Sequence, residues 1–483
     1  MRLNGIRDKK VTVVGLARSG VGAANMLAEL GAQVTVTDIK PEEALQEYVQ
    51  QLNPAVRRVL GAHPAEIFLG ADMLIVSPAV PLDIDPLSSA KAKGIPVIGE
   101  IELAYQAAEN GFDTSSFPPL LKERKGGFLA ITGANGKSTT TSLLDHMMKK
   151  GGFRTLLGGN IGNALTEEIV KYRAHGSAFD IDFIVAELSS FQLESIKDFR
   201  PRGAAVINIT PDHLDRYHTL EEYGNAKARI FENQKKDDFL ILNRDDPEIM
   251  RIEREKVNVK SEKPNIIYFS RRQEVEGLYY KDGIIYCAIA ALSLSPYPFP
   301  LIPAEEIKIK GVHNLENAMA ASAMALLAGC PVGAVIDALR EFPGLEHRLE
   351  FVRELNGVSY FNDSKGTNVG AVIKSLESFS APVILIAGGR DKAGDFTVLR
   401  HLIKERVKAA VLIGEAAEKM RKAFGDITET IMAVDFRDAV EAAQRVAEKG
   451  DVVLLSPACA SFDMFLNFQD RGRQFKKLVT EMT

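Results

Sequence analysis

Cysteine is scarce in this chain, which has only three in 483 residues: Cys287, Cys330 and Cys459. They lie far apart and form no CxxC pair. This spacing argues against a structural zinc site and against the disulfide framework of a small secreted protein. Isolated thiols fit a reducing compartment, so we expect a cytoplasmic protein.

Long apolar runs and an excess of charge of one sign are also missing. Nowhere do 18 uninterrupted apolar residues occur, so no transmembrane helix is expected. The first residues, MRLNGIRDKKVTVVG, are typical of a first strand and not of a signal peptide. Lys and Arg number 59 against 64 Asp and Glu, a formal net charge of −5. A surface this balanced argues against nucleic acid or an anionic membrane as the main partner.

The chain does contain many short β-branched runs that alternate with helical segments, which is typical of parallel strands connected by helices. At roughly 150 residues per domain, the length allows about three domains. The polar stretch Asn110–Lys125 predicts connecting structure, and a further series begins near Gly344. The expected strands are Val11–Val14, Val34–Thr37, Met73–Val76, Pro96–Ile98, Phe128–Ile131, Phe183–Ala186, Ala205–Ile209, Phe239–Leu242, several between about Asn265 and Pro303, Phe351–Leu355, Val358–Phe361, Val383–Ala387, Ala410–Ile413 and Val452–Leu455.

The strongest local signal is the segment ITGANGKSTT, which follows an expected strand and precedes a helical stretch. Its glycines let backbone N–H groups surround an anion, Lys137 can neutralise phosphate oxygens, and Ser138 can offer a hydroxyl to Mg²⁺. The usual pattern requires glycine where this chain has Ile131. The segment therefore predicts a variant nucleoside-triphosphate loop.

Other loops carry weaker signals. The segment GLARSG between a strand and a helix, with Asp38 at the end of the next strand, fits a nucleotide-diphosphate site and a plain tight turn about equally, because Ala17 stands where a dinucleotide fingerprint has glycine. Glu187 ends an expected strand, where an NTPase places a metal-binding or water-orienting acid. His213, in the segment DHLDR, is by itself more typical of an ordinary loop histidine than of a metal ligand.

The C-terminal part has loops at the ends of three expected strands: NDSKGTN, GGRDK and SPACAS. Lysines, hydroxyl groups and helix N-termini gathered at the carboxyl ends of neighbouring strands form a pocket for a small anion such as a carboxylate. Three such loops in one domain favour a binding site over a coincidence of turn chemistry.

These segments, in this order, resemble the Mur ligases of peptidoglycan synthesis over nearly the whole chain. Further segments that carry the resemblance are GGNIG, ELSSFQLE, NITPDHLDRY, GVHNLEN, GLEHR and SPACASFD. NDSKGTN and SPACASFD are similar to the branch of the family that adds D-glutamate. The resemblance implies an α/β protein of three domains: a Rossmann-like UDP-sugar-binding domain at 1–98, a central ATP-binding domain with a P-loop ATPase-like, mostly parallel sheet at 99–343, and a Rossmann-like amino-acid-binding domain at 344–483.

The activity that the resemblance implies is ATP-dependent ligation of D-glutamate to UDP-N-acetylmuramoyl-L-alanine through an acyl phosphate, in the cytoplasm. It implies ATP and Mg²⁺ as cofactors, with two metal sites, small-molecule substrates as the only partners, and a monomer. It also implies that Lys227 is carbamylated, because an anionic oxygen suits a hard cation.

The resemblance assigns site residues one by one. The catalytic residues are Lys137, His347 and Lys365. ATP is assigned to Gly133, Asn135, Gly136, Lys137, Ser138, Thr139, Asn314, Asn317, Arg348 and Asp363; the UDP substrate to Ser19, Asp38, Lys40 and Asn160; D-glutamate to Thr367, Lys392, Ser461 and Phe468; and the metal to Ser138, Glu187, His213 and Lys227. His213 thereby becomes a predicted ligand. Spacing alone would leave Lys227 as a lysine on the surface of a helix.

The chain departs from the family pattern at two positions, and part of it matches no pattern. Ala134 stands where the family usually has threonine, and Ala79 where it usually has glycine, which removes a hydroxyl group and backbone freedom respectively. These changes affect details of the ATP and UDP contacts. The segment from about Arg251 to Pro303 resembles no part of the family pattern.

Three other classes of protein compete with this interpretation. A folylpolyglutamate synthase would not need the GLARSG domain or SPACASFD. A nucleotide-dependent switch would have no use for Lys392 and Ser461. An oxidoreductase is disfavoured by Ala17.

Overall fold

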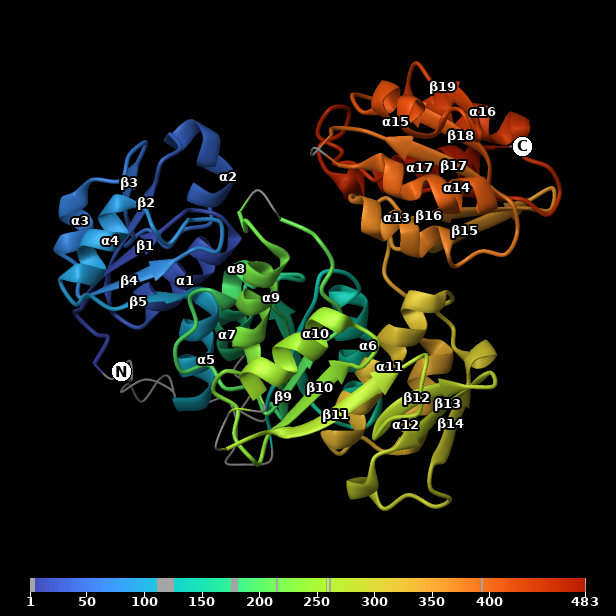
Figure 1. The fold of residues 1–483 in the computed structure, drawn as a ribbon. Coiled ribbons are helices and arrows are strands. Elements are labelled where there is room, and N and C mark those ends of the chain that lie inside the picture. The colour runs from blue at the N-terminus through green and yellow to red at the C-terminus, as the bar shows by residue number, and fades with distance from the viewer. Residues whose placement is uncertain are drawn as a thin grey trace. The chain divides into compact units, whose positions relative to one another are not determined.

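The computed structural model describes residues 5–110, 126–174, 181–213, 216–257, 259, 262–391 and 394–482 (Figure 1). The chain divides into two compact units. The first consists of Met1–Ile209, His213–Ala304 and Ala318–Leu339, and the second of Thr210–Asp212, Glu305–Asn317 and Arg340–Thr483. After Asn110, the predicted connecting segment lies outside the described residues.

The N-terminal sheet has five parallel strands in the order β3-β2-β1-β4-β5. Val13 of β1 packs in one core cluster with α1, and its neighbour Val14 packs in another with α3 and α4, so helices cover both faces. The elements are β1 (Lys10–Val14), α1 (Arg18–Glu29), β2 (Gln33–Asp38), α2 (Gln46–Val49), β3 (Arg57–Leu60), α3 (Ala65–Leu69), β4 (Met73–Val76), α4 (Asp85–Ala92) and β5 (Val97–Gly99).

The central sheet has nine strands in the order β14-β13-β12-β11-β10-β9-β6-β8-β7. Strands β6 and β8 are buried along their whole length and lie next to each other. The strands are β6 (Gly127–Thr132), β7 (Thr155–Gly159), β8 (Phe183–Glu187), β9 (Gly203–Val206), β10 (Phe239–Asn243), β11 (Asn265–Ser270), β12 (Gly277–Lys281), β13 (Ile284–Ala288) and β14 (Phe299–Pro303). The helices are α5 (Glu100–Asn110), α6 (Lys137–Lys150), α7 (Leu165–Ala174), α8 (Ser190–Leu193), α9 (Leu220–Ala228), α10 (Pro247–Ile252), α11 (Val312–Leu327) and α12 (Val332–Glu341).

The strands from β7 to β12 pair in parallel, whereas β12 with β13 and β13 with β14 pair antiparallel. The strand-rich region expected between about Asn265 and Pro303 therefore forms β11 to β14, at the edge of the central sheet opposite β7. A hairpin at this edge needs only a short turn, whereas each parallel pair needs a crossover connection.

The C-terminal sheet has six strands in the order β15-β16-β20-β17-β18-β19, all parallel except β15 against β16. Leu385 and Ile386 of β17 belong to separate core clusters on the two faces. The elements are β15 (Glu350–Leu355), β16 (Val358–Asn362), α13 (Val369–Leu376), β17 (Val383–Gly388), α14 (Arg400–Arg406), β18 (Val407–Ile413), α15 (Ala417–Phe424), β19 (Glu429–Met432), α16 (Phe436–Val446), β20 (Val452–Leu455) and α17 (Phe468–Glu481).

The expected α/β class with mostly parallel sheets is confirmed. Three strands were not expected: β3, β7 and β19. Each lies at an edge of its sheet. An edge strand is only partly buried, so its sequence lacks the continuous apolar run of a central parallel strand. Within the described ranges, every helix is too short or too polar to span a bilayer.

The buried carboxylate of Glu102 fixes α5 to the loop before β9. One carboxylate oxygen, Oε2, accepts hydrogen bonds from the backbone N–H groups of Lys197 at 2.8 Å, Asp198 at 3.0 Å and Phe199 at 2.9 Å. The other, Oε1, accepts one from Gln106 Nε2 at 2.7 Å. Glu102 is fully buried, so these N–H groups have no easy replacement acceptor.

We predict that Glu102→Ala speeds hydrogen exchange at the amides of residues 197–199 by roughly tenfold or more, because a buried group left without its partner costs about 1–3 kcal/mol. Exchange is followed by mass spectrometry. Glu42→Ala is the control, since Glu42 forms an exposed ion pair with Arg58 and such changes stay within about 0.5 kcal/mol. Unchanged exchange in Glu102→Ala would show that the carboxylate does not hold this loop.

Candidate active site

The predicted nucleoside-triphosphate loop connects the buried strand β6 to the first turn of α6. Gly133 has φ 157° and Gly136 has φ 81°, both in the region that favours glycine. A Cβ on Gly133 would lie 2.5 Å from Ile207 Cγ1, so the loop also needs glycine there for space. The Lys137 ammonium donates to the carbonyl oxygens of Gly133 at 2.9 Å and Ala134 at 2.8 Å, which keeps it inside the loop.

Asn208, which follows the neighbouring strand β9, holds this loop. Its Oδ1 accepts the backbone N–H groups of Ala134 at 3.1 Å and Asn135 at 2.8 Å, and its Nδ2 donates to the Asn135 carbonyl at 2.9 Å. The strand expected through Ile209 ends at Val206, because the chain turns toward the loop at this point. Asn208 lies in the segment NITPDHLDRY, but a lone asparagine after a strand gave no signal of this function.

Glu187 occupies the carboxyl end of β8 and is 2% exposed. Its Oε1 accepts a hydrogen bond from Asn160 Nδ2 at 2.7 Å. Its Oε2 is buried and accepts no hydrogen bond from the described residues. A buried anionic oxygen without a partner is costly, so this atom fits a cation ligand. Asn160, assigned to the UDP substrate by resemblance, here contacts the predicted metal ligand.

Lys227 lies on α9, is 1% exposed, and reaches the phosphate loop. Its Nζ donates to the Gly133 carbonyl oxygen at 2.8 Å and lies 4.4 Å from the centroid of the Tyr223 ring. His213, whose φ is 54°, has its ring centroid 6.3 Å from that of the same tyrosine. Tyr223 therefore lies next to both predicted metal ligands. Lys227 is not the helix-surface lysine that its spacing alone indicated. Ser138, in the first turn of α6, is also buried.

The N-terminal residues predicted for the UDP substrate lie at the carboxyl ends of β1 and β2. The Asp38 carboxylate accepts the backbone N–H groups of Leu16 at 2.7 Å and Lys40 at 2.9 Å. It therefore shapes the turn that presents the exposed Lys40 side chain. Ser19 lies in the first turn of α1, where backbone N–H groups face outward.

The second unit contains the other residues predicted for ATP. Asn317 Nδ2 donates to Asn314 Oδ1 at 3.0 Å, and both side chains are buried at the start of α11. The Asp363 carboxylate follows β16 and accepts hydrogen bonds from the hydroxyl groups of Ser375 and Ser456, each at 2.7 Å. Burial raises the pKa of Asp363 to about 6, although these hydrogen bonds favour its charged form. Arg348 lies next to His347 in the loop before β15.

His347, Lys365 and Phe468 lie together in this unit. The backbone N–H of Lys365 donates to the His347 carbonyl at 3.0 Å, and its Nζ lies 4.1 Å from the centroid of the Phe468 ring. The His347 ring meets Phe468 edge-on with centroids 6.2 Å apart. Of the residues predicted for D-glutamate, Phe468 joins this cluster. Thr367 is in the loop after Lys365, Ser461 is buried after β20, and Lys392 is outside the described residues.

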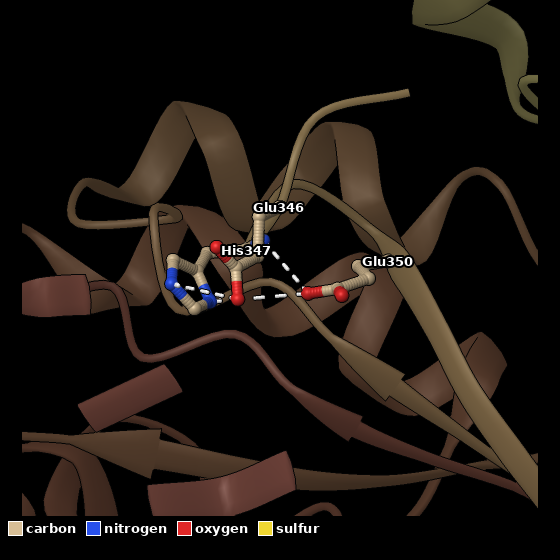
Figure 2. A group of neighbouring side chains, drawn as sticks. All are labelled: Glu346, His347 and Glu350. Atoms are coloured by element: carbon tan, nitrogen blue, oxygen red, sulfur yellow. Dashed lines mark hydrogen bonds and ion pairs between the residues drawn. The ribbon is translucent and has the colours of Figure 1, made fainter. Parts of the chain in front are cut away.

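Figure 2 shows His347 beside two glutamates, an arrangement that resembles a metal site. The Lys476 ammonium already contacts both carboxylates, at 3.0 Å from Glu346 Oε1 and 2.5 Å from Glu350 Oε1. These carboxylates are therefore neutralised by a lysine from α17. We interpret the group as an ion-pair network around His347.

Arg471 of α17 donates hydrogen bonds to two loops of the C-terminal part, the one that carries Lys365 and the one that carries Ser461. Its guanidinium is 2% exposed and donates to the Ser364 carbonyl oxygen at 2.8 Å, the Cys459 carbonyl oxygen at 3.3 Å and the Ala460 carbonyl oxygen at 3.4 Å. The loops that carry Lys365 and Ser461 therefore share one buried donor. Sequence reasoning missed Arg471, because an arginine on an amphipathic helix is usually exposed.

Family models match the chain in three successive parts. The model of the Mur ligase MurD-like N-terminal domain matches residues 9–99, that of the Mur ligase middle domain residues 131–325, and that of the Mur ligase glutamate ligase domain residues 347–459.

Similar proteins cover the whole chain. The UDP-N-acetylmuramoylalanine–D-glutamate ligase of Geotalea uraniireducens (strain Rf4) is 48% identical over 98% of both chains, and that of Geotalea daltonii is 46% identical over 98% of both. The MurF ligase of Thermotoga maritima, solved in complex with ADP, has a TM-score of 0.57 at 16% identity and covers 93% of this chain and 96% of its own, a likeness of fold. This chain belongs to the Mur ligase family, whose members are ATP-dependent enzymes that form amide bonds.

We predict that the charged form of Asp363 lowers the stability of the second unit. Its folded pKa of about 6 lies above the ordinary value of 3.8, so its contribution to stability is complete below pH of about 4 and is lost as pH rises through about 6. The difference between these two pKa values corresponds to roughly 3 kcal/mol. Urea unfolding followed by circular dichroism at pH 4 and 6.5 measures this loss.

Asp363→Asn is the matched comparison, because the amide keeps the shape of the side chain and does not titrate. Other carboxyl groups titrate equally in both proteins, so the difference between the two isolates Asp363. The same loss of stability in both would mean that Asp363 does not titrate in this range.

Proposed function

We propose that this chain joins the amino group of D-glutamate to the L-alanyl carboxylate of UDP-N-acetylmuramoyl-L-alanine, with ATP as the energy source. The main support is the identity of 48% over 98% of the chain to a relative that bears the name of this ligase. The reaction belongs in the cytoplasm, because all three cysteines are buried free thiols, which suits a reducing compartment.

The reaction proceeds through an acyl phosphate. The substrate carboxylate attacks the γ-phosphorus of ATP and ADP leaves. The D-glutamate amine then attacks the activated carbonyl, and the tetrahedral intermediate expels phosphate and loses the amine proton. Phosphorylation turns a poor leaving oxygen into a good one, so the protein has mainly to position three reactants and screen their charges.

The site residues divide this work. Lys137 neutralises the phosphoryl oxygens from within the phosphate loop. Asn314, Asn317, Arg348 and Asp363 hold the nucleotide, Ser19, Asp38, Lys40 and Asn160 hold the UDP substrate, and Thr367, Lys392, Ser461 and Phe468 hold D-glutamate. A lysine and hydroxyl groups suit its side-chain carboxylate, since charge-assisted hydrogen bonds contribute about 1.5–3 kcal/mol each.

Ser138, Glu187, His213 and Lys227 would hold Mg²⁺ in two sites. The unpartnered buried oxygen of Glu187 supports this assignment. When bound, Mg²⁺ neutralises charge on the phosphate oxygens. Lys227 enters this set as a carbamate: its neutral amine forms a bond to the carbon of CO₂ and releases a proton, which leaves an anionic oxygen ligand.

The proposal is tested by phosphate release from ATP with UDP-N-acetylmuramoyl-L-alanine and one amino acid at a time. We expect release with D-glutamate, and little with L-glutamate, L-lysine or L-alanine. Lys137→Ala should abolish it. Release that needs neither the UDP substrate nor D-glutamate would favour a nucleotide switch, and ligation of L-glutamate to a folate would favour a folylpolyglutamate synthase.

A separate prediction concerns Lys227. We expect Lys227→Ala to lower kcat by roughly 100-fold or more. Mutation of a residue that only supports a metal ligand typically costs about 10–100-fold, and loss of the ligand itself should cost more. Acetate at high concentration should restore part of the activity by supplying a carboxylate oxygen. Steady-state kinetics with and without acetate measure both effects.

Lys236→Ala is the control, since Lys236 is an exposed lysine a short distance along the same chain. It should keep normal activity and should not respond to acetate. Normal activity in Lys227→Ala would refute the carbamate. So would the combination of two results: mass spectrometry of the natural protein's peptides that finds no added carboxyl group on Lys227, and no rescue of Lys227→Ala by acetate.

A further inference from the structure

The His347 imidazole is held by a buried amide. Asn362, the last residue of β16, places its Nδ2 2.9 Å from His347 Nδ1. Both side chains are buried. A histidine ring can either donate or accept at Nδ1, so the direction of this hydrogen bond decides where the ring carries its proton.

The orientation of the Asn362 amide follows from its other contacts. Its Oδ1 accepts the backbone N–H of Ser364 at 3.1 Å. Its Nδ2 faces Glu350 Oε2 at 3.0 Å and the Gly472 carbonyl oxygen at 3.3 Å. A flipped amide would set its oxygen against a carboxylate and a carbonyl, and its NH₂ against another N–H. The network therefore assigns nitrogen to the side that faces His347.

We propose that Asn362 is a positioning residue that keeps His347 as the neutral tautomer with its proton on Nε2. An amide NH₂ only donates, so Nδ1 must accept and carry no proton. His347 Nε2 is buried and forms no hydrogen bond with the described residues. The closest acidic atom, Glu346 Oε1, lies 3.8 Å away, beyond hydrogen-bond distance. The ring thus offers one N–H donor that no residue in the described part of the chain uses.

The charges around the ring agree with a neutral state. Burial is the main effect and lowers the pKa of His347, as do Lys476 and Arg473 of α17, whereas Glu346 and Glu350 raise it. Both glutamates are paired with Lys476, which reduces the extent to which they raise the pKa of His347. The Lys365 ammonium lies over the Phe468 ring, 4.1 Å from its centroid, and the same ring meets the His347 imidazole edge-on.

Helix α17 fixes the position of the ring as well as its tautomer. A Cβ on Gly472 would lie 2.3 Å from His347 Nδ1 and 2.8 Å from its Cε1. Only a glycine allows the helix backbone to approach the imidazole this closely. The same residue supplies the carbonyl that helps to orient Asn362.

This inference deepens the proposed function, on which its chemical meaning rests. A neutral imidazole that donates from Nε2 can stabilise an anionic oxygen of the substrate, such as a carboxylate or phosphoryl oxygen. It cannot take the amine proton of D-glutamate at that nitrogen. His347 therefore acts as a hydrogen-bond donor and not as a general base.

The tautomer is measured on the full chain without substrates, so its test does not depend on the proposed function. The protein is labelled with ¹⁵N-histidine, and the His347 signals among the eight histidines are identified by their absence in His347→Gln. We expect the Nδ1 signal of an unprotonated nitrogen and the Nε2 signal of a protonated one, unchanged from pH 8 to pH 6. A proton on Nδ1, or a charged ring in this range, would overturn the proposal.

Asn362→Asp tests the cause. A carboxylate accepts from Nδ1, so the variant should place a proton on Nδ1, raise the pKa of His347, and shift the kcat–pH profile. Glu350→Gln is the control, because its amide oxygen can still accept from Asn362, so the tautomer should not change. Circular dichroism checks folding. An Asn362→Asp protein that folds and keeps the original tautomer would refute the role of Asn362.

Gly472→Ala provides a second variant. It should displace the ring and lower kcat at least tenfold, with little change in KM for ATP. If Asn362→Asp fails to fold, the spectrum of the natural protein still decides the tautomer. Unchanged kinetics in Gly472→Ala would mean that the ring position does not matter.

Discussion

The carbonyl oxygen of Gly133 is the point on which the central part of the site depends. It accepts hydrogen bonds from the side-chain nitrogens of both Lys137 and Lys227, one from α6 and one from α9. A carbonyl oxygen has two lone pairs, so it can accept both donors, and the φ of 157° at Gly133 lies in the region that favours glycine. The phosphate loop, the start of α6 and the buried lysine of α9 are thereby fixed relative to one another.

The C-terminal unit relies on a different device, a helix that supplies contacts to several loops. Helix α17 contributes the Arg471 guanidinium, the Gly472 backbone and the Lys476 ammonium, which hold the two loops, the ring of His347 and its flanking glutamates. A helix is a rigid element, so groups on successive turns keep fixed spacing. The loops that carry Lys365 and Ser461 and the ring of His347 are therefore held in fixed positions before substrates bind.

The sequence predicted the central strands of each sheet, and the three strands that it missed, β3, β7 and β19, all lie at edges. Fully buried strands such as β6 and β17 are continuous apolar runs, whereas β3 begins with two exposed arginines. At the site, the phosphate loop was visible because its residues are contiguous. Other site residues act through contacts that join distant segments of the chain: Lys227, Asn208, Asn362 and Arg471. A single residue of one of these types carries no local signal in the sequence. Family resemblance supplied Lys227, and only the structure revealed the other three.

The antiparallel edge of the central sheet has a consequence for how this chain can vary. Strands β9, β10 and β11 separate the hairpins β12–β14 from β6, which bears the phosphate loop. Hydrogen bonding in a sheet connects only neighbouring strands, so an insertion or deletion in the hairpins leaves the register of β6 and β8 intact. A change of length at this edge is therefore expected to leave the phosphate loop after β6 in place. The segment from Arg251 to Pro303, in which the sequence alone showed no family motif, lies within residues 131–325, which the model of the Mur ligase middle domain matches.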